Sequence, residues 1–302
     1  MSRVYDALKK LEEQGREVAQ EQPAAAAKTS VVPPRKMDEF LAAPALPVRV
    51  ASEDRIVVHS DRRSAGAERF RLIRMALRNA FAGKSQKVLL ITSPLSRDGK
   101  STVALNLATS LADQGKVKVL LLEADLHRPS LLAYLGVDGL KGLADVVEGA
   151  ADPATAIRRI EPLGFYLLPA GNSPEHPAEL LQSERFHGLL RDVKASFDWV
   201  LIDCPPAFPL SDVVALSPHA DGVLLVVRAG VTPREAVLET AQLFKPGQIV
   251  GMVLNASESL NSLYSEYYYR RSGTELSDLS KERAGDPRLS SKGLSVGRRT
   301  EN

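Results

Sequence analysis

The segment Lys87–Thr102, KVLLITSPLSRDGKST, constrains the fold of this chain more than any other stretch. A short apolar run is followed by a polar loop, and Gly99-Lys100-Ser101-Thr102 then opens an amphipathic stretch. Strand, loop and helix in this order are the setting of a phosphate-binding loop, because the loop amides and the helix N-terminus donate hydrogen bonds to phosphate oxygens. We therefore predict nucleotide contacts from this loop, at Ser96, Arg97, Asp98, Gly99, Lys100, Ser101 and Thr102.

The tripeptide Gly-Lys-Ser/Thr is weak evidence on its own, because composition alone produces it in roughly one chain in six of this length. The strict pattern G-x-x-x-x-G-K-[ST] is also broken, since Pro94 stands where its first Gly should be. The strand before the loop, the helix after it and the acidic strand ends further along the chain favour nucleotide binding over coincidence.

Short apolar segments alternate with helical patterns along the rest of the chain. This alternation indicates a parallel sheet that is covered by helices on both faces. We therefore predict an α/β fold of the P-loop NTPase type with a mostly parallel central sheet. The predicted strands are 87–92, 117–123, 165–168, 199–203, 222–227 and 249–254. The predicted helices are 99–114, 129–135, 143–149, 177–181, 184–195 and 233–244.

The composition along the chain predicts four regions. Residues 1–15 form a short amphipathic helix, and 16–54 form a disordered linker rich in Pro and Ala. Residues 55–258 form the P-loop domain, in which Ile56–Val58 is a short strand. Residues 259–302 form a flexible, polar tail.

A helix is predicted over 68–81, and it carries a charged stripe. Glu68, Arg71 and Arg74 recur at intervals of three and lie on one face. Two interpretations stay open from this spacing: a solvated charged face, or a charge-paired contact between subunits.

Composition excludes several classes of protein. The 302 residues are 44% hydrophobic and 25% charged, which is typical of a soluble globular protein, and no apolar run approaches the length of a membrane span. The net charge of +2 is too small to indicate nucleic-acid binding. The single Cys204 cannot form an internal disulfide, which fits a reducing cytoplasm. No Cys/His cluster has zinc-site spacing.

Carboxylates follow two of the predicted core strands. Glu123 and Asp125 come after the second strand, and Asp203 ends the third. The carboxyl ends of parallel strands meet at one edge of a sheet, so these acids should lie beside the phosphate-binding loop. Phosphoryl transfer needs phosphates held by amides and Lys100, a magnesium ion, and a carboxylate that accepts a proton.

The tail begins with a cluster of tyrosines. Tyr264, Tyr267, Tyr268 and Tyr269 lie within six positions, and Arg270-Arg271 follows. No strand or helix period surrounds them, so they are not core residues. They are either an aromatic patch for a partner or exposed hydroxyls that accept phosphate.

Three segments, ITSPLSRDGKST, LLLEADLHRPS and WVLIDCPP, resemble the nucleotide motifs of the bacterial tyrosine kinases of capsule and exopolysaccharide synthesis. These are P-loop proteins unrelated to eukaryotic protein kinases. AERFRLIRMAL resembles their E-x-x-R-x-x-R-x-N oligomerisation helix, PAGNSPEHPAELLQS their PNPAELL loop, and YSEYYYRR their autophosphorylated tail. The resemblance covers about residues 56–271, and the opening MSRVYDALKKLEEQ looks like the leader of stand-alone members.

The resemblance implies an ATP-dependent protein-tyrosine autokinase with Mg²⁺ as its metal. Its catalytic residues would be Lys100, Glu123, Asp125 and Asp203. Ser101 would ligate magnesium directly, and Asp125 and Asp203 would hold it through water. The phosphate acceptors would be Tyr264, Tyr267, Tyr268 and Tyr269, presented in trans. Oligomerisation would use Glu68, Arg71 and Arg74.

The resemblance also implies partners and a location. A ring-like homo-oligomer would bring each tail to the next active site, and phosphorylation would weaken that assembly. The activator would be the cytoplasmic segment of a membrane polysaccharide copolymerase, and a tyrosine phosphatase would act on the tail. The protein would be cytoplasmic, held at the inner face of the membrane through its partner, and would not bind nucleic acid.

Several positions depart from the family pattern. Glu123 stands where the family has Asp, its base for the tyrosine hydroxyl, and His127 stands at the Arg position beside Arg128. Ser96-Arg97-Asp98 replaces Pro-Gly-Glu, and the lost Gly restricts the backbone. Ala76 replaces the Asn of the oligomerisation motif. Asn255, at the end of the last strand, is a candidate for a contact to the base.

Two alternatives to the autokinase stay open. One is a catalytically weak ATP-binding scaffold that regulates a membrane polysaccharide copolymerase. The other is a partition or division-site ATPase, but the signature Lys of those proteins is replaced here by Leu95 and they have no tyrosine tail.

Overall fold

The structure is a computed structural model, which describes residues 37–50, 56–84, 87–209 and 212–257. These residues all belong to one of the two units into which the chain divides. The predicted helix at 1–15 and the tyrosine cluster in the tail lie outside the described residues.

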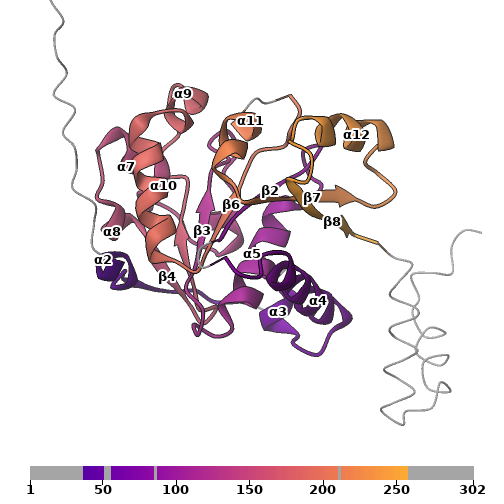
Figure 1. Cartoon of the computed structure of the whole chain (residues 1–302). Helices are drawn as coiled ribbons and strands as arrows, with labels where there is room; N and C mark the ends of the chain where they lie inside the picture. Colours follow the sequence, from indigo (N-terminus) through magenta and orange to yellow (C-terminus); the bar gives the residue numbers. More distant parts are fainter. Residues whose placement is uncertain (1–36, 51–55, 85–86, 210–211, 258–302) are drawn as a thin grey trace, which may run out of the picture. The chain divides into compact units, whose positions relative to one another are not determined.

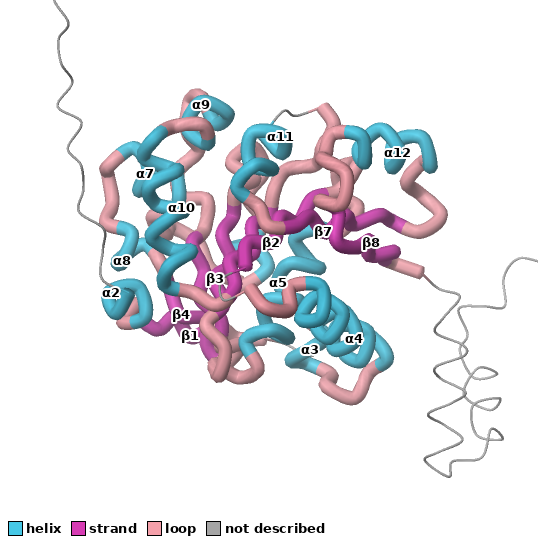
Figure 2. The backbone as a smooth tube through the Cα atoms, viewed as in Figure 1, coloured by secondary structure: helices cyan, strands magenta, loops and turns pink. Residues whose placement is uncertain are grey.

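Within the described residues, eight strands form one sheet in the order β1-β4-β5-β3-β6-β2-β7-β8 (Figure 2). All neighbours are parallel except β4 and β5, which pair antiparallel. The strands are β1 (Ala45–Pro47), β2 (Lys87–Thr92), β3 (Val119–Glu123), β4 (Arg158–Glu161), β5 (Phe165–Leu168), β6 (Trp199–Asp203), β7 (Gly222–Arg228) and β8 (Ile249–Asn255). The predicted mostly parallel α/β sheet is confirmed.

Helices lie on both faces of the sheet (Figure 1). They are α2 (Met37–Leu41), α3 (Val57–Ser60), α4 (Ala65–Ala80), α5 (Lys100–Ala112), α6 (Leu131–Tyr134), α7 (Leu143–Glu148), α8 (Pro153–Ala156), α9 (Pro177–Leu181), α10 (Glu184–Ser196), α11 (Asp212–Leu216), the 3-10 turn η1 (Ser217–His219) and α12 (Arg234–Gln242). None of these described helices is long and apolar enough to cross a bilayer.

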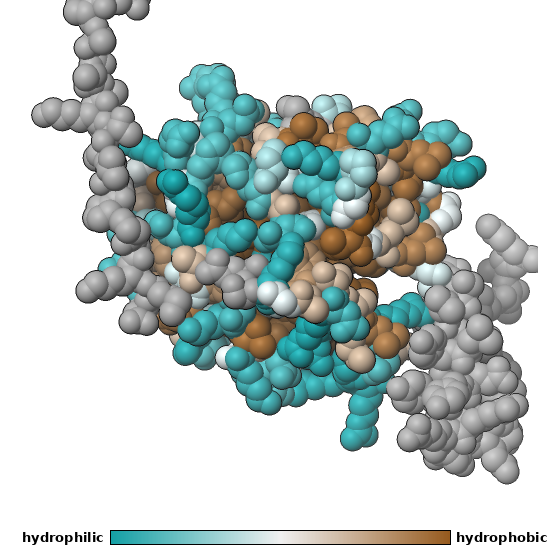
Figure 3. All heavy atoms as spheres, viewed as in Figure 1, coloured by the Kyte–Doolittle hydropathy of each residue, from teal (hydrophilic) through white to brown (hydrophobic). Residues whose placement is uncertain are grey.

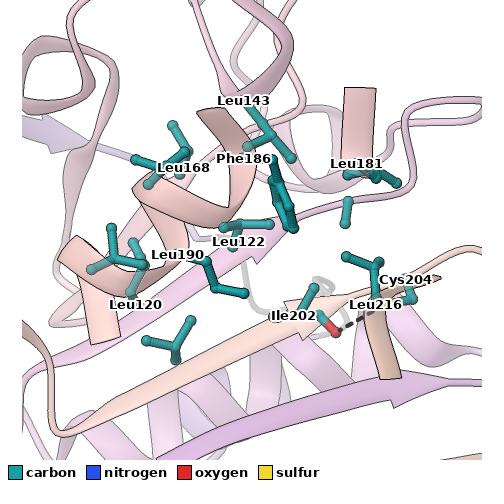
Figure 4. Packing of buried hydrophobic residues seen from close by; sticks show 14 of the residues in the cluster. Leu120, Leu122, Leu143, Leu168, Leu181, Phe186, Leu190, Ile202, Cys204 and Leu216 are labelled. Atoms are coloured by element: carbon teal, nitrogen blue, oxygen red, sulfur yellow. Dashed lines mark hydrogen bonds between the residues drawn. The ribbon is translucent and has the colours of Figure 1, made fainter. Parts of the chain in front are cut away.

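Each central strand buries side chains on both of its faces, which is why these strands read as continuous apolar runs. In β2, Val88 and Leu90 point into one core cluster, and Leu89 and Ile91 point into the other. The first cluster packs under α7, α9, α10 and α11 (Figure 4). The second packs under α4 and α5. Eleven of the 13 residues of α5 are buried, so this helix lies deep in the domain.

Cys204 follows β6 and lies in the first of these clusters, 0% exposed. Its thiol points to the carbonyl oxygen of Ile202 at 3.7 Å (Figure 4). Burial raises the pKa of this thiol well above its usual value.

The predicted linker ends earlier than residue 54, because residues 37–47 belong to the fold. Phe40 of α2 is fully buried, and β1 adds a strand beside β4 at the edge of the sheet. The short strand predicted at Ile56–Val58 is wrong. A helix, α3, runs there instead, and the amide of Val58 donates to the side chain of Asn106 on α5 at 3.2 Å.

The parallel strands β2, β3, β6, β7 and β8 all end at the same edge of the sheet. The loops at which ligands of such sheets bind therefore lie together at this edge.

β8 is the edge strand beside β7, and two of its apolar side chains are exposed. Met252 is 53% exposed and Leu254 is 59% exposed. The surface view shows hydrophobic residues around α12 and β8 (Figure 3).

We predict that Phe40→Ala lowers the free energy of unfolding by about 3 to 5 kcal/mol, because it leaves a cavity in a packed cluster. Urea denaturation measures this. Leu238→Ala is the control, since that side chain is 51% exposed, and it should change stability little. An unchanged free energy of unfolding in Phe40→Ala would contradict the assignment of residues 37–47 to the folded domain.

Candidate active site

The phosphate-binding loop joins β2 to α5 through two residues with left-handed backbone. Gly99 caps α5 with φ 96°, and a Cβ there would lie 2.0 Å from Nδ2 of Asn255. Arg97 has φ 68°, a conformation that costs a residue with a side chain on the order of 1 kcal/mol. The loop therefore keeps a left-handed turn although Arg97 stands where the resembling family has Gly.

Neighbouring strand ends hold this loop in place. The carboxylate of Asp98, 2% exposed, accepts hydrogen bonds from the amide of Leu95 at 3.1 Å and the hydroxyl of Thr232 at 2.7 Å. Nδ2 of Asn255 donates to the carbonyl oxygen of Asp98 at 2.9 Å. Nη1 of Arg228 donates to the carbonyl oxygen of Arg97 at 3.3 Å. Asp98 and Asn255 thus support the backbone of the loop.

Lys100 is the centre of the charged cluster. Its Nζ lies 2.8 Å from Oδ2 of Asp125 and 3.8 Å from Oδ1 of Asp203, and it donates to Oγ of Ser101 at 3.2 Å. The side chain of Lys100 is 12% exposed, that of Asp125 6% and that of Asp203 0%. Four residues that the sequence predicted as functional are therefore in mutual reach.

Burial and charge oppose each other in this cluster. Burial alone would lower the pKa of Lys100, but the carboxylates of Asp203 and Asp125 outweigh burial and raise it. Burial raises the pKa of Asp203 to about 6, although the ammonium of Lys100 acts against that rise. Lys100 therefore stays charged at neutral pH, and Asp203 is a carboxylate without full compensation.

The cluster lacks one positive charge, and a bound cation would supply it. Neither carboxylate oxygen of Asp203 has a hydrogen-bond partner within the described part of the chain, although both are buried. The same residues contain no cluster of three His, Cys, Asp or Glu that would form an all-protein metal centre. Magnesium does not need one, because it keeps several waters and binds through one or two protein oxygens together with phosphates. The residues present fit a magnesium ion that arrives with a nucleotide.

Glu123 lies beside this cluster, paired in register with Asp203 across β3 and β6. Its side chain is 1% exposed. Both carboxylate oxygens accept backbone hydrogen bonds, from the amides of Ser130 and Leu131 and from that of Ala170. Burial raises the pKa of Glu123, although these amides act against that rise.

The charged stripe of α4 faces α5 of the same chain. Arg71 pairs with Glu68 and donates to the carbonyl oxygen of Arg62. Nη1 of Arg74 donates to the carbonyl oxygen of Ser110 at 2.9 Å. Arg62, Arg71 and Arg74 line a cavity of about 180 Å³ near the C-terminal end of α5, whereas the phosphate-binding loop precedes the N-terminal end of that helix. The structure thus does not bring the stripe to the active site.

Three contacts of the site were not predicted from the sequence. Arg228, the last residue of β7, and Thr232, in the loop that follows it, hold the phosphate-binding loop. Nε2 of His127 lies 2.9 Å from Oδ2 of Asp212 and donates to it in the tautomer that carries the proton on Nε2. The signal that could have found Thr232 and Arg228 is their position, since polar residues at or just beyond the carboxyl end of a central parallel strand lie at the ligand edge.

Comparisons with known proteins agree with this geometry. A family model described as an AAA domain matches residues 97–245. Tyrosine-protein kinase YwqD of Bacillus subtilis (strain 168) is 31% identical over 216 residues, which are 71% of this chain and 90% of YwqD. The chain belongs to the bacterial tyrosine-protein kinase family.

A solved structure and a further relative are also similar to this chain. The kinase domain of Escherichia coli tyrosine kinase ETK has a TM-score of 0.63 at 29% identity, covering 66% of this chain and 79% of that chain. Succinoglycan biosynthesis transport protein ExoP of Rhizobium meliloti (strain 1021) is 34% identical over 221 residues, 70% of this chain but 28% of ExoP. The family predicted from the three nucleotide motifs is confirmed, and so is the fold.

We predict opposite pH effects for two buried aspartates in the protein without nucleotide. The folded-state pKa of Asp203 is raised from 3.8 to about 6, so its ionisation reduces stability as pH rises through that window. Asp203→Asn should therefore stabilise the fold at pH 7, by on the order of 3 kcal/mol, and have little effect near pH 4. Thermal unfolding at both pH values measures this.

Asp145→Asn is the matched control. Burial would raise the pKa of Asp145, but the amide of Gly142, the ammonium of Lys141 and the amide of Asn172 outweigh burial and lower it. The charged form therefore stabilises the fold above the usual pKa, and that stability is lost as pH falls. Asp145→Asn should destabilise at pH 7. Equal shifts for both variants would contradict the assignment of Asp203 as an uncompensated charge.

Proposed function

We propose that this chain is an ATP-dependent protein-tyrosine autokinase that phosphorylates its own C-terminal tyrosines. The observation that carries the proposal is Lys100, which stands at the start of α5 and bridges the carboxylates of Asp125 and Asp203. Membership of a tyrosine-protein kinase family gives that arrangement its reaction class.

The nucleotide would lie on the loop from Ser96 to Thr102. Its phosphates would accept hydrogen bonds from the loop amides and from Lys100, which adds charge at the outer phosphates. The hydroxyl of Ser101 would ligate Mg²⁺ directly, and Asp125 and Asp203 would hold it through water. When bound, the ion neutralises phosphate charge. Support for these ligands comes from the buried, unbonded oxygens of Asp203.

In the reaction, the tyrosine oxygen forms a bond to the γ-phosphorus while the bond from that phosphorus to the β-γ bridging oxygen breaks, so ADP leaves. Lys100 stabilises charge on the transferred group, and the hydroxyl proton passes to a carboxylate. The resemblance predicts Glu123 as this carboxylate. That assignment stays a prediction, because both oxygens of Glu123 accept backbone hydrogen bonds in the structure.

The acceptors in this proposal are the tail residues Tyr264, Tyr267, Tyr268 and Tyr269. A neighbouring subunit would present them in trans within a ring-like homo-oligomer. Glu68, Arg71 and Arg74 of α4 would contribute to that interface through their solvent-exposed atoms, since their side chains are 30%, 41% and 23% exposed. Added phosphate charge would weaken the assembly, and a tyrosine phosphatase would restore it.

We place the protein in the cytoplasm, at the inner face of the membrane through a partner. The partner would be the cytoplasmic segment of a polysaccharide copolymerase, and the regulated process would be exopolysaccharide or capsule synthesis and export. ExoP supports this, since its name ties it to succinoglycan biosynthesis and transport and it is 34% identical to this chain over 221 residues.

A second candidate is an ATP-binding scaffold with weak catalysis that regulates the same copolymerase. The observation that favours it is Glu123, whose carboxylate has no oxygen free of amide hydrogen bonds. The phosphate and metal contacts would then serve assembly alone.

Mass spectrometry after incubation with Mg²⁺ and ATP tests the autokinase, with the protein alone and with a candidate partner segment. We predict phosphate on 264–269 in the native chain. Lys100→Met should lower it by at least about a hundredfold, because the variant loses the charge at the transferred group. Circular dichroism checks the fold of the variant. Normal phosphorylation of Lys100→Met would remove the loop from the mechanism, and ATP binding without phosphate in the native chain would favour the scaffold.

Replacing Tyr264, Tyr267, Tyr268 and Tyr269 together with Phe should abolish phosphotyrosine and leave the affinity for Mg·ATP unchanged, because the acceptors lie outside the nucleotide site. Calorimetry measures the affinity. Tyr134→Phe is a matched control on the described domain, since its ring is 37% exposed. Persistent phosphotyrosine in the fourfold variant would place the acceptors elsewhere in the chain.

A further inference from the structure

The carboxylate of Glu123 is surrounded by backbone donors. Oε1 accepts hydrogen bonds from the amides of Ser130 at 2.6 Å and Leu131 at 2.8 Å. Oε2 accepts one from the amide of Ala170 at 3.1 Å. With the side chain 1% exposed, these three amides replace the water that a carboxylate would otherwise need.

These three donors come from two different segments. Ser130 and Leu131 stand where α6 begins, at the end of the loop that leaves β3, and Ala170 lies in the loop that leaves β5. The loop between Glu123 and Ser130 contains Asp125, whose Oδ1 accepts the amide of Arg128 at 3.0 Å and whose Oδ2 meets Lys100. Glu123 therefore closes the loop that presents Asp125.

The segment at Ala170 is fixed from its other side as well. The amide of Ala144 donates to the carbonyl oxygen of Ala170 at 2.9 Å. Oδ2 of Asp145 accepts the amides of Gly142 at 2.9 Å and Asn172 at 3.1 Å. Because the β5 loop is held by α7 in this way, it is a rigid support against which Glu123 can hold the loop of Asp125.

We propose that Glu123 is a positioning residue: its carboxylate ties the loop that carries Asp125 to the β5 loop, and so sets the distance between Asp125 and Lys100. The inference rests on the proposed function for its catalytic consequence. The three amides orient the Glu123 carboxylate toward the two loop segments. The proposal also accounts for the side-chain length at 123, because an Asp is one methylene shorter and its carboxylate would stand further from these amides.

The test compares Glu123→Asp, Glu123→Gln and the control Glu148→Gln in the full chain. Glu148 is an exposed residue at the end of α7. Amide hydrogen exchange is followed in peptides that contain Ser130–Leu131 or Ala170, and calorimetry gives the affinity for Mg·ATP. These readouts do not depend on phosphorylation, so the inference and the autokinase can fail separately.

Glu123→Asp should speed exchange in both peptides and weaken Mg·ATP binding about tenfold, because it loses at least one charge-assisted hydrogen bond. Glu123→Gln should speed exchange mainly in one peptide, since its amide oxygen still accepts bonds while its NH₂ group faces a donor. Glu148→Gln should change neither. Glu123→Gln keeps the test decisive where the shorter Asp impairs folding.

Unchanged exchange and unchanged Mg·ATP affinity in Glu123→Gln, with phosphorylation lost, would overturn the inference and restore Glu123 as the proton acceptor. Unchanged exchange in both variants, with phosphorylation retained, would overturn it as well. Faster exchange confined to these two segments, together with weaker Mg·ATP binding, would support it.

Discussion

The ion cluster at the start of α5 is the interaction on which the rest of the structure depends. One ammonium, that of Lys100, stands between the carboxylates of Asp125 and Asp203, and all three side chains are nearly buried. A buried cluster with one positive and two negative groups is not self-compensating, so it contributes little to the stability of the fold. Under the function proposed above, the arrangement serves binding, because a magnesium ion would supply the positive charge that the cluster lacks.

The register of the sheet brings the members of this cluster close together. Register pairs place Ile91 and Glu123 directly beside Asp203, so three strand ends converge without long loops. The apolar clusters on both faces hold these strands, and the left-handed turns at Arg97 and Gly99 start α5 with Lys100 as its first residue. Strain and uncompensated charge are thus confined to one edge of a well-packed domain.

Sequence alone predicted the central strands and the members of the ion cluster, because both follow from local patterns. Buried parallel strands are continuous apolar runs, and acids at their ends must meet at one edge. It did not predict β1 or β4, since Arg158–Glu161 is mostly polar and pairs at the side of the sheet, where only Ile160 is buried. Nor did it predict the contact of Glu123 with the amide of Ala170 or that of Asn255 with the carbonyl of Asp98, because these backbone groups are distant in sequence and only the tertiary fold brings them near.

The position of Cys204 has a practical consequence. It is the single cysteine of the 302 residues, it is 0% exposed, and burial raises the pKa of its thiol, so the reactive thiolate is scarce. The native chain should therefore react very little with thiol-directed reagents. A cysteine introduced at a surface position can carry a fluorophore or spin label without any change to the end of β6, where replacement of Cys204 would disturb the residue next to Asp203.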